Sequence, residues 1–197
     1  MLTNIVTHDA NVVRASITVV DHIKATDLTS PTPCANWNLT DLLTHMTAQH
    51  RGFTAAARGN GAELEAWANL PLGPDPVAEY RNAAEEVLTA FAEEGVVSRE
   101  FAIPEVNADA RFPGDIAIAM HTVDYLVHAW DVARAIGVEF EADGDAVWAT
   151  AALVAMIPDD ASRLAPGAAF APALPTAGAS EFDTMLAALG RDPHWVR

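Results

Sequence analysis

The sequence contains little cysteine and little positive charge. Its 197 residues include one cysteine, Cys34, so no disulfide can form within the chain. Free cysteine is typical of a reducing compartment, and we therefore expect a cytoplasmic protein. Lys and Arg number 11 against 27 Asp and Glu, for a formal net charge of −16. Because such a surface repels phosphate groups, we expect neither nucleic acid nor an anionic membrane surface as a partner.

Long apolar runs and N-terminal targeting signals are also missing. No run approaches the ~18 consecutive apolar residues of a membrane-spanning helix. The first ten residues have no basic segment followed by an apolar core, so they do not resemble a signal peptide. With 51% hydrophobic and 19% charged residues, the chain still has enough apolar material for a sizeable core. This composition excludes global disorder and predicts a soluble intracellular protein.

Apolar residues at helical spacing predict four main helices. They run over about residues 9–25, from Asn38 to just before Gly59, from Pro76 through Phe91, and over 115–136. Two shorter helices are expected in the tail, over about 145–157 and after the capping residue Ser180. We therefore expect an all-α helical bundle with its core at about 8–137. The extension at about 139–197 should pack on the same domain, which then covers residues 1–197.

The fourth predicted helix is apolar on almost every side, yet it carries a strip of polar residues. His121, Asp124, His128 and Asp131 fall within a strip roughly 80° wide. Asp124 and His128 are four residues apart, so their side chains meet on one face. Burial of a carboxylate and imidazoles costs free energy unless each group finds a partner or a metal ion. Zinc and similar divalent cations accept this donor set, so the strip is consistent with half of a metal site.

The same strip also fits a polar seam between helices that contains no metal. In that interpretation His121 is a structural histidine, and Asp131 pairs with Arg134 on the surface. A third metal ligand would come from the second predicted helix, which offers His45 and His50. Helical projection places His50 in the middle of the apolar face and His45 at its edge, which slightly favours His50.

Three segments resemble the motifs of a known family. The first is Thr32-Pro33-Cys34-Ala35-Asn36-Trp37, followed by Asp41-Leu42-Leu43-Thr44-His45. The second runs from Asp124 to Gly137 (DYLVHAWDVARAIG), and the third is Leu189-Gly190-Arg191-Asp192-Pro193 near the C-terminus. They are similar to motifs of the DinB-like and mycothiol-dependent maleylpyruvate isomerase superfamily, which is large in actinobacteria. The resemblance spans nearly the whole chain.

This resemblance implies a four-helix bundle that binds a divalent metal through a histidine of the second helix and a carboxylate-x-x-x-His pair on the fourth. Carried over to this sequence, the metal ligands are His45, Asp124 and His128. The metal we expect first is zinc, with nickel or another transition metal as alternatives, and mycothiol is implied as a thiol cofactor. The characterised isomerase has a glutamate at the position of the shorter Asp124.

These observations leave three functional hypotheses. The first is a metal-dependent enzyme in which a thiol or a water at the metal acts on a small electrophilic substrate. His50, His121 or Asp131 would then act as a proton shuttle or orient a ligand imidazole. The second is a non-catalytic metal-binding bundle, and the third is an interaction protein with a metal-free polar seam. The expected partner is a small molecule or thiol, and the sequence leaves a homodimer open.

Overall fold

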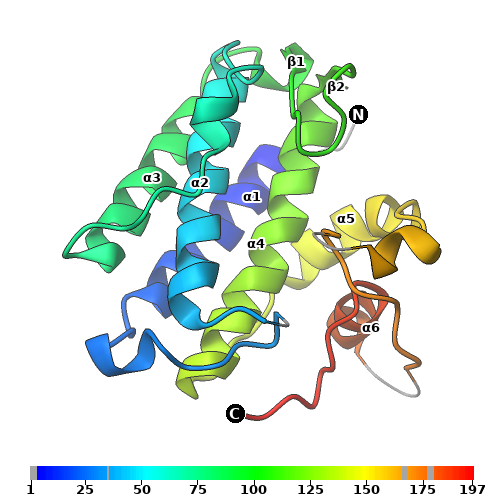
Figure 1. Ribbon diagram of the computed structural model, residues 1–197. Helices are drawn as coiled ribbons and strands as arrows, with labels where there is room; N and C mark the ends of the chain where they lie inside the picture. The colour runs from blue at the N-terminus through cyan, green and yellow to red at the C-terminus, as the bar shows by residue number, and fades with distance from the viewer. Residues whose placement is uncertain (1–3, 35, 166–167, 177–179) are drawn as a thin grey trace.

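The computed structural model describes residues 4–34, 36–165, 168–176 and 180–197. Four long helices run side by side as a bundle (Figure 1): α1 (Ile5–Val20), α2 (Leu39–Ala57), α3 (Pro76–Phe91) and α4 (Gly114–Ile136). Two shorter helices follow on the α4 side: α5 (Gly144–Ala155) and α6 (Glu181–Ala188). This is the all-α architecture that the sequence predicts.

Short elements connect the helices. Four of them are 3-10 turns: η1 (Ala25–Asp27), η2 (Leu64–Trp67), η3 (Val96–Ser98) and η4 (Ala161–Leu164). Between α3 and α4, the strands β1 (Glu100–Phe101) and β2 (Phe112–Pro113) pair antiparallel, with Phe101 opposite Phe112. The sequence suggests an extended segment over 96–103. The structure confirms it for β1, whereas residues 96–98 form a 3-10 turn.

Local side-chain chemistry sets most helix boundaries. The side chains of Asn38, Asp75 and Ser180 accept hydrogen bonds from backbone N–H groups at the starts of α2, α3 and α6. Such capping satisfies N–H groups that have no partner inside the helix. Gly137 ends α4 in the left-handed conformation, with φ at 75°, which glycine adopts without steric cost. The predicted range of α1 was wrong at both ends, because it runs over residues 5–20 rather than 9–25.

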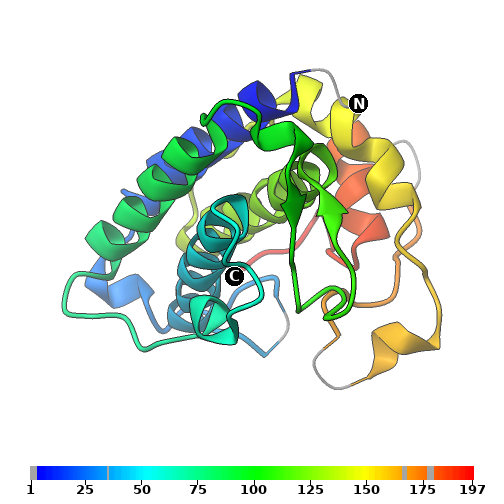
Figure 2. The same cartoon turned by 90° about the horizontal axis from the view of Figure 1, so that it is seen from above.

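The bundle surrounds an apolar core that α5 and α6 extend on one side. Val12 of α1, Leu42 of α2 and Leu126 of α4 belong to the same buried cluster as Val147 of α5 and Leu186 of α6. Viewed from above, α5 and α6 lie on the side of α4 that faces away from α3 (Figure 2). Within the part of the chain that the structure describes, no helix is both long and apolar enough to cross a membrane.

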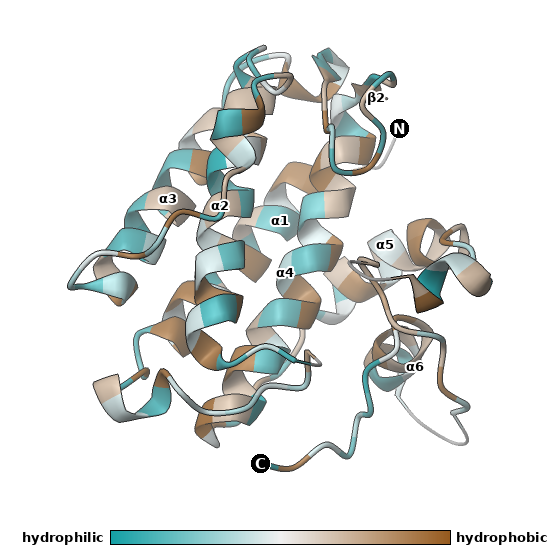
Figure 3. Ribbon diagram, viewed as in Figure 1, coloured by the Kyte–Doolittle hydropathy of each residue, from teal (hydrophilic) through white to brown (hydrophobic). Residues whose placement is uncertain are grey.

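Polar residues interrupt the apolar surface of α4, although this helix is buried along most of its length. Figure 3 shows hydrophilic bands at several levels of α4 and of the neighbouring α2. Some of the polar side chains in these helices are buried in the bundle, among them His50 of α2 and His121, His128 and Asp131 of α4. The candidate functional site lies where α2 and α4 meet.

Candidate metal centre

His45 of α2 lies at the same level of the bundle as Asp124 and His128 of α4. One ligand atom from each side chain, a ring nitrogen or a carboxylate oxygen, lies within 4.8 Å of the other two. His128 Nε2 is 3.4 Å from Asp124 Oδ1, and the ring centroids of His45 and His128 are 5.2 Å apart. Among the described residues, this is the one group of three or more His, Cys, Asp or Glu side chains arranged to hold a metal ion.

The donor set fits a divalent transition metal. Two imidazole nitrogens and one carboxylate oxygen are ligands that zinc accepts, and three protein ligands leave a coordination position for another molecule. Asp124 Oδ2 is buried and has no hydrogen-bond partner among the described residues, so it still has lone pairs to offer a cation. The His128 side chain is 7% exposed and that of Asp124 is 25% exposed. The group is therefore partly open to solvent.

Burial and charge set different protonation states for the three side chains. Burial lowers the pKa of His45 to about 4. Burial favours the neutral form of Asp124, but the nearby His128 imidazole outweighs it and lowers the pKa of Asp124 to about 2. Burial also opposes charge on His128, but the carboxylates of Asp124 and Asp131 raise its pKa to about 9. At neutral pH the metal-free group therefore contains a carboxylate, a neutral imidazole and an imidazolium.

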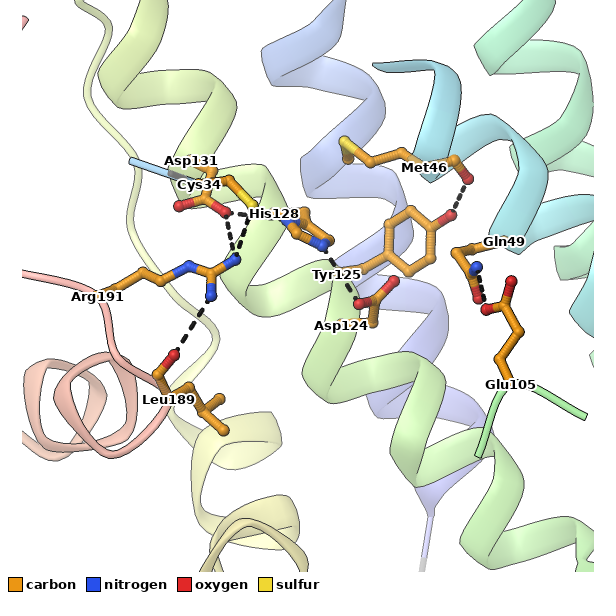
Figure 4. Close-up of polar contacts among 10 residues, drawn as sticks. All are labelled: Cys34, Met46, Gln49, Glu105, Asp124, Tyr125, His128, Asp131, Leu189 and Arg191. Carbon is orange, nitrogen blue, oxygen red and sulfur yellow. Dashed lines mark hydrogen bonds and ion pairs between the residues drawn. The ribbon is translucent and has the colours of Figure 1, made fainter. Parts of the chain in front are cut away.

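A second carboxylate holds His128 from its other side. Asp131 Oδ2 accepts a hydrogen bond from His128 Nδ1 at 2.9 Å and one from the Arg191 guanidinium at 3.2 Å. Asp131 is fully buried and Arg191 is 5% exposed. Because Nδ1 of His128 is committed to Asp131, its Nε2 faces Asp124 (Figure 4). A surface pair of Asp131 with Arg134 is therefore wrong.

Cys34 lies on the Arg191 side of the group. Its Sγ accepts a hydrogen bond from the Arg191 guanidinium at 3.4 Å. Burial raises the pKa of the Cys34 thiol to about 11, although the charge of Arg191 acts in the opposite direction. The thiol is therefore protonated at neutral pH, which argues against a role as a nucleophile.

Further residues lie beside the group: Trp37, which the sequence suggests as a core anchor or a wall of the pocket, and Gln49 and Glu105, to which sequence reasoning assigned no role. The Trp37 ring centroid lies 4.9 Å from that of His45. On the other side of Asp124, Gln49 donates a hydrogen bond to Glu105 at 2.6 Å (Figure 4). Gln49 stands four residues after His45 in α2, a helical spacing that would have revealed it. Glu105 comes from the loop between β1 and β2, and no local pattern points to it.

His50 and His121 lie outside the candidate ligand group. Both are fully buried, and His50 Nδ1 lies 3.1 Å from His121 Nε2. His50 does point inward, as helical projection predicts, but toward His121 rather than toward Asp124 and His128. The structure thus places His45, and not the residue that projection favours, beside the carboxylate-x-x-x-His pair.

A helical bundle with a histidine on its second helix and an Asp-x-x-x-His pair on its fourth belongs to the DinB-like class. A match to a family of known sequences identifies the family within this class. Residues 10–133 match the family described as the mycothiol maleylpyruvate isomerase N-terminal domain, and the chain belongs to this family.

Two curated relatives are uncharacterized proteins of Mycobacterium tuberculosis, from strains CDC 1551 / Oshkosh and ATCC 25618 / H37Rv. Each is 31% identical over 127 residues, which cover 62% of this chain and 62% of the relative. The chain therefore spans less than two thirds of the length of these relatives.

Two solved structures have a similar fold. The crystal structure of the mycothiol-dependent maleylpyruvate isomerase matches with a TM-score of 0.57 at 14% identity. The crystal structure of a histidine-to-alanine mutant of that isomerase matches with a TM-score of 0.60 at 12% identity. Each match covers 78% of this chain and 69% of the other chain. At this identity, the likeness establishes the shared fold.

Proposed function

We propose that the protein is a metal-dependent enzyme. His45, Asp124 and His128 would hold a divalent cation, zinc in the first instance, and the site would bring a thiol of the mycothiol type to a small electrophilic substrate. The observation that carries this proposal is the convergence of three ligand atoms within 4.8 Å of one another at a partly exposed position. Membership of the mycothiol maleylpyruvate isomerase N-terminal domain family supports the thiol as the partner.

A divalent cation at this position supplies a Lewis acid that favours the thiolate form of a thiol at neutral pH. The residues of the chain prepare the site for it. Asp131 accepts a hydrogen bond from the Nδ1–H group of His128, which leaves Nε2 as the ligand atom and keeps the ring in one orientation. Arg191 donates to the same carboxylate oxygen and offsets the cost of burying the Asp131 charge.

Residues around the group would shape the space for the ligand. The Trp37 ring packs against His45 and lies 6.3 Å from the ring of His128, where it keeps water from one side of the site. On the other side, burial raises the pKa of Glu105, although its hydrogen bond from Gln49 acts in the opposite direction. A carboxyl group beside the site with a raised pKa is a candidate to exchange a proton with a bound ligand.

A purely structural role for the metal is the alternative. Structural zinc sites are closed by four protein ligands, whereas the described residues here provide three and leave a quarter of the Asp124 side chain exposed. This difference favours a catalytic centre. We also propose a cytoplasmic location and small-molecule partners, and light scattering on the purified protein will decide whether it forms a homodimer.

Metal content and cobalt spectroscopy test the proposal. Wild-type protein should bind one equivalent of zinc or cobalt, and mycothiol added to the cobalt form should produce a thiolate-to-cobalt charge-transfer band. His45→Ala should lose both signals. His22→Ala, which removes an exposed histidine just after α1, should keep them. Absence of stoichiometric metal from the loaded wild type, or unchanged binding in His45→Ala, would contradict the proposal.

Chelation separates the catalytic from the structural role. If the centre is catalytic, removing the metal should leave the far-UV circular dichroism spectrum and the melting temperature nearly unchanged. Loss of the folded structure on chelation would favour the structural role instead.

A further inference from the structure

A buried chain of three side chains links α1, α4 and α2. It consists of Asp9, His121 and His50, which are all fully buried. His121 Nδ1 is 2.7 Å from Asp9 Oδ1, and His121 Nε2 is 3.1 Å from His50 Nδ1. Thr122 also donates its hydroxyl proton to Asp9 Oδ1 at 3.1 Å. We call these three residues the Asp9–His121–His50 chain.

The direction of the hydrogen bonds in this chain follows from the tautomer of His121. The His121 tautomer that donates from Nδ1 to Asp9 Oδ1 keeps a lone pair on Nε2. His50 must then donate through Nδ1. Both bonds are fully shielded from water, so breaking either one would leave a buried polar atom without a partner, which is unfavourable.

A second link between α2 and α4 lies between this chain and the candidate metal centre. The Tyr125 hydroxyl donates to the backbone oxygen of Met46. The Tyr125 ring stacks on His50, with centroids 3.9 Å apart and an interplanar angle of 11°. Met46 directly follows His45, and Tyr125 directly follows Asp124. Three layers therefore join α2 to α4 in succession: the candidate ligands, the Tyr125 hydrogen bond and the His50–His121 hydrogen bond.

We propose that the Asp9–His121–His50 chain sets the separation of α2 and α4, and thereby holds His45 opposite Asp124 and His128. The inference rests on the proposed function of the metal centre. Ligand atoms on two helices form a working site only if the helices keep them within about 0.5 Å of the required positions. A hydrogen bond between buried groups on the same two helices provides such a constraint. Asp9 anchors it to α1. His50 and His121 are thus positioning residues.

Two substitutions at position 50 test this inference, because they differ in whether a donor remains. His50→Asn places an amide N–H close to the position of the ring Nδ1–H, whereas His50→Leu fills similar space without a donor. His50→Leu should weaken cobalt binding about tenfold and change the visible spectrum of the bound cobalt. His50→Asn should stay within about threefold of the wild type.

Ser16→Ala is the matched control. Ser16 is fully buried, and its hydroxyl bonds the Tyr80 hydroxyl at 2.6 Å, which links α1 to α3. Its loss removes two buried hydrogen bonds, to the Tyr80 hydroxyl and to Val13 O. Tyr80 packs against His50 with ring centroids 5.2 Å apart, so this control disturbs a neighbour of His50 but leaves the hydrogen bonds between α2 and α4 in place. Ser16→Ala should therefore keep the wild-type cobalt affinity and spectrum. If it weakens binding as much as His50→Leu, general destabilisation explains the effect and the inference fails.

A measurement on the metal-free protein separates this inference from the proposed function. The imidazole nitrogen resonances of His45 and His128 should shift in His50→Leu and remain close to the wild type in His50→Asn and Ser16→Ala. If the wild type binds no cobalt, the proposed function fails, while these resonances still decide the positioning role. Wild-type resonances in a folded His50→Leu variant would overturn the positioning role.

If His50→Leu does not fold, Asp9→Asn should shift the same resonances, because a neutral amide accepts a hydrogen bond more weakly than a carboxylate. Unchanged resonances would again overturn the inference.

Discussion

Binding of a divalent cation at pH 7 should release one proton, which comes from His128. A metal binds the neutral form of an imidazole and the ionised form of a carboxylate. Burial lowers the pKa of His45 to about 4, so this ring is already neutral. The pKa of Asp124 is lowered to about 2 by His128 against the effect of burial, so it is already ionised. Only His128, whose pKa is about 9, must lose a proton.

The structure sets the size of this effect. With a pKa of about 9, His128 is almost entirely protonated at pH 7, so proton competition weakens cation binding by a factor on the order of 100, or roughly 3 kcal/mol. The apparent Kd should therefore fall about tenfold for each unit of pH between about pH 6 and 8. It should become constant once the pH exceeds the pKa of His128. Affinity thus rises with pH.

Isothermal titration calorimetry at pH 7, in two buffers of different ionisation enthalpy, counts the released protons. One proton per cation is expected for the wild type. Asp131→Asn removes one of the two carboxylates that raise the pKa of His128, so its Kd should become constant at a lower pH. Release of no proton or of two protons, or a Kd independent of pH between about pH 6 and 8, would refute the reasoning.

Two further predictions concern the stability of the metal-free protein. Arg191→Met should lower the unfolding free energy by about 3 kcal/mol, because it takes the guanidinium away from the buried carboxylate of Asp131; urea denaturation measures the loss. His45→Asn should make the unfolding free energy of the metal-free protein less sensitive to acid. The pKa of His45 is about 4 when folded against 6.5 as its ordinary value. As the pH decreases from about 6.5 to about 4, the unfolded chain binds this proton before the folded protein does. The unfolding free energy of the wild type should therefore fall by up to roughly 3 kcal/mol, and the variant should lack this part of the fall.

Each of these predictions has a control. Arg81→Met removes the exposed partner of Asp21 and should change the unfolding free energy little. If Arg81→Met and Arg191→Met lose the same unfolding free energy, burial of the ion pair has no effect on its contribution to stability. For position 45, urea titrations at pH values from 7 to about 4 compare wild type and variant. Parallel profiles would show that His45 takes no part in the acid response.

Local information in the sequence was sufficient for most of the fold. Capping by Asn38, Asp75 and Ser180 depends on residues three positions apart, and α2, α3 and α6 begin where these residues predict. The same local logic paired Asp124 with His128, because residues four apart in a helix share a face. Metal binding by this pair and His45 remains a prediction.

Only the tertiary structure decided which groups meet across the bundle. Helical projection describes each residue relative to the axis of its own helix, and it cannot give the rotation of α2 against α4. Projection alone therefore slightly favoured His50, which bonds His121, whereas the family resemblance implied His45, which lies beside the carboxylate. The arginine that pairs with Asp131 is likewise Arg191, sixty residues later in the chain, rather than the nearby Arg134. Contacts between such distant residues depend on how the helices pack, and no local pattern encodes that packing.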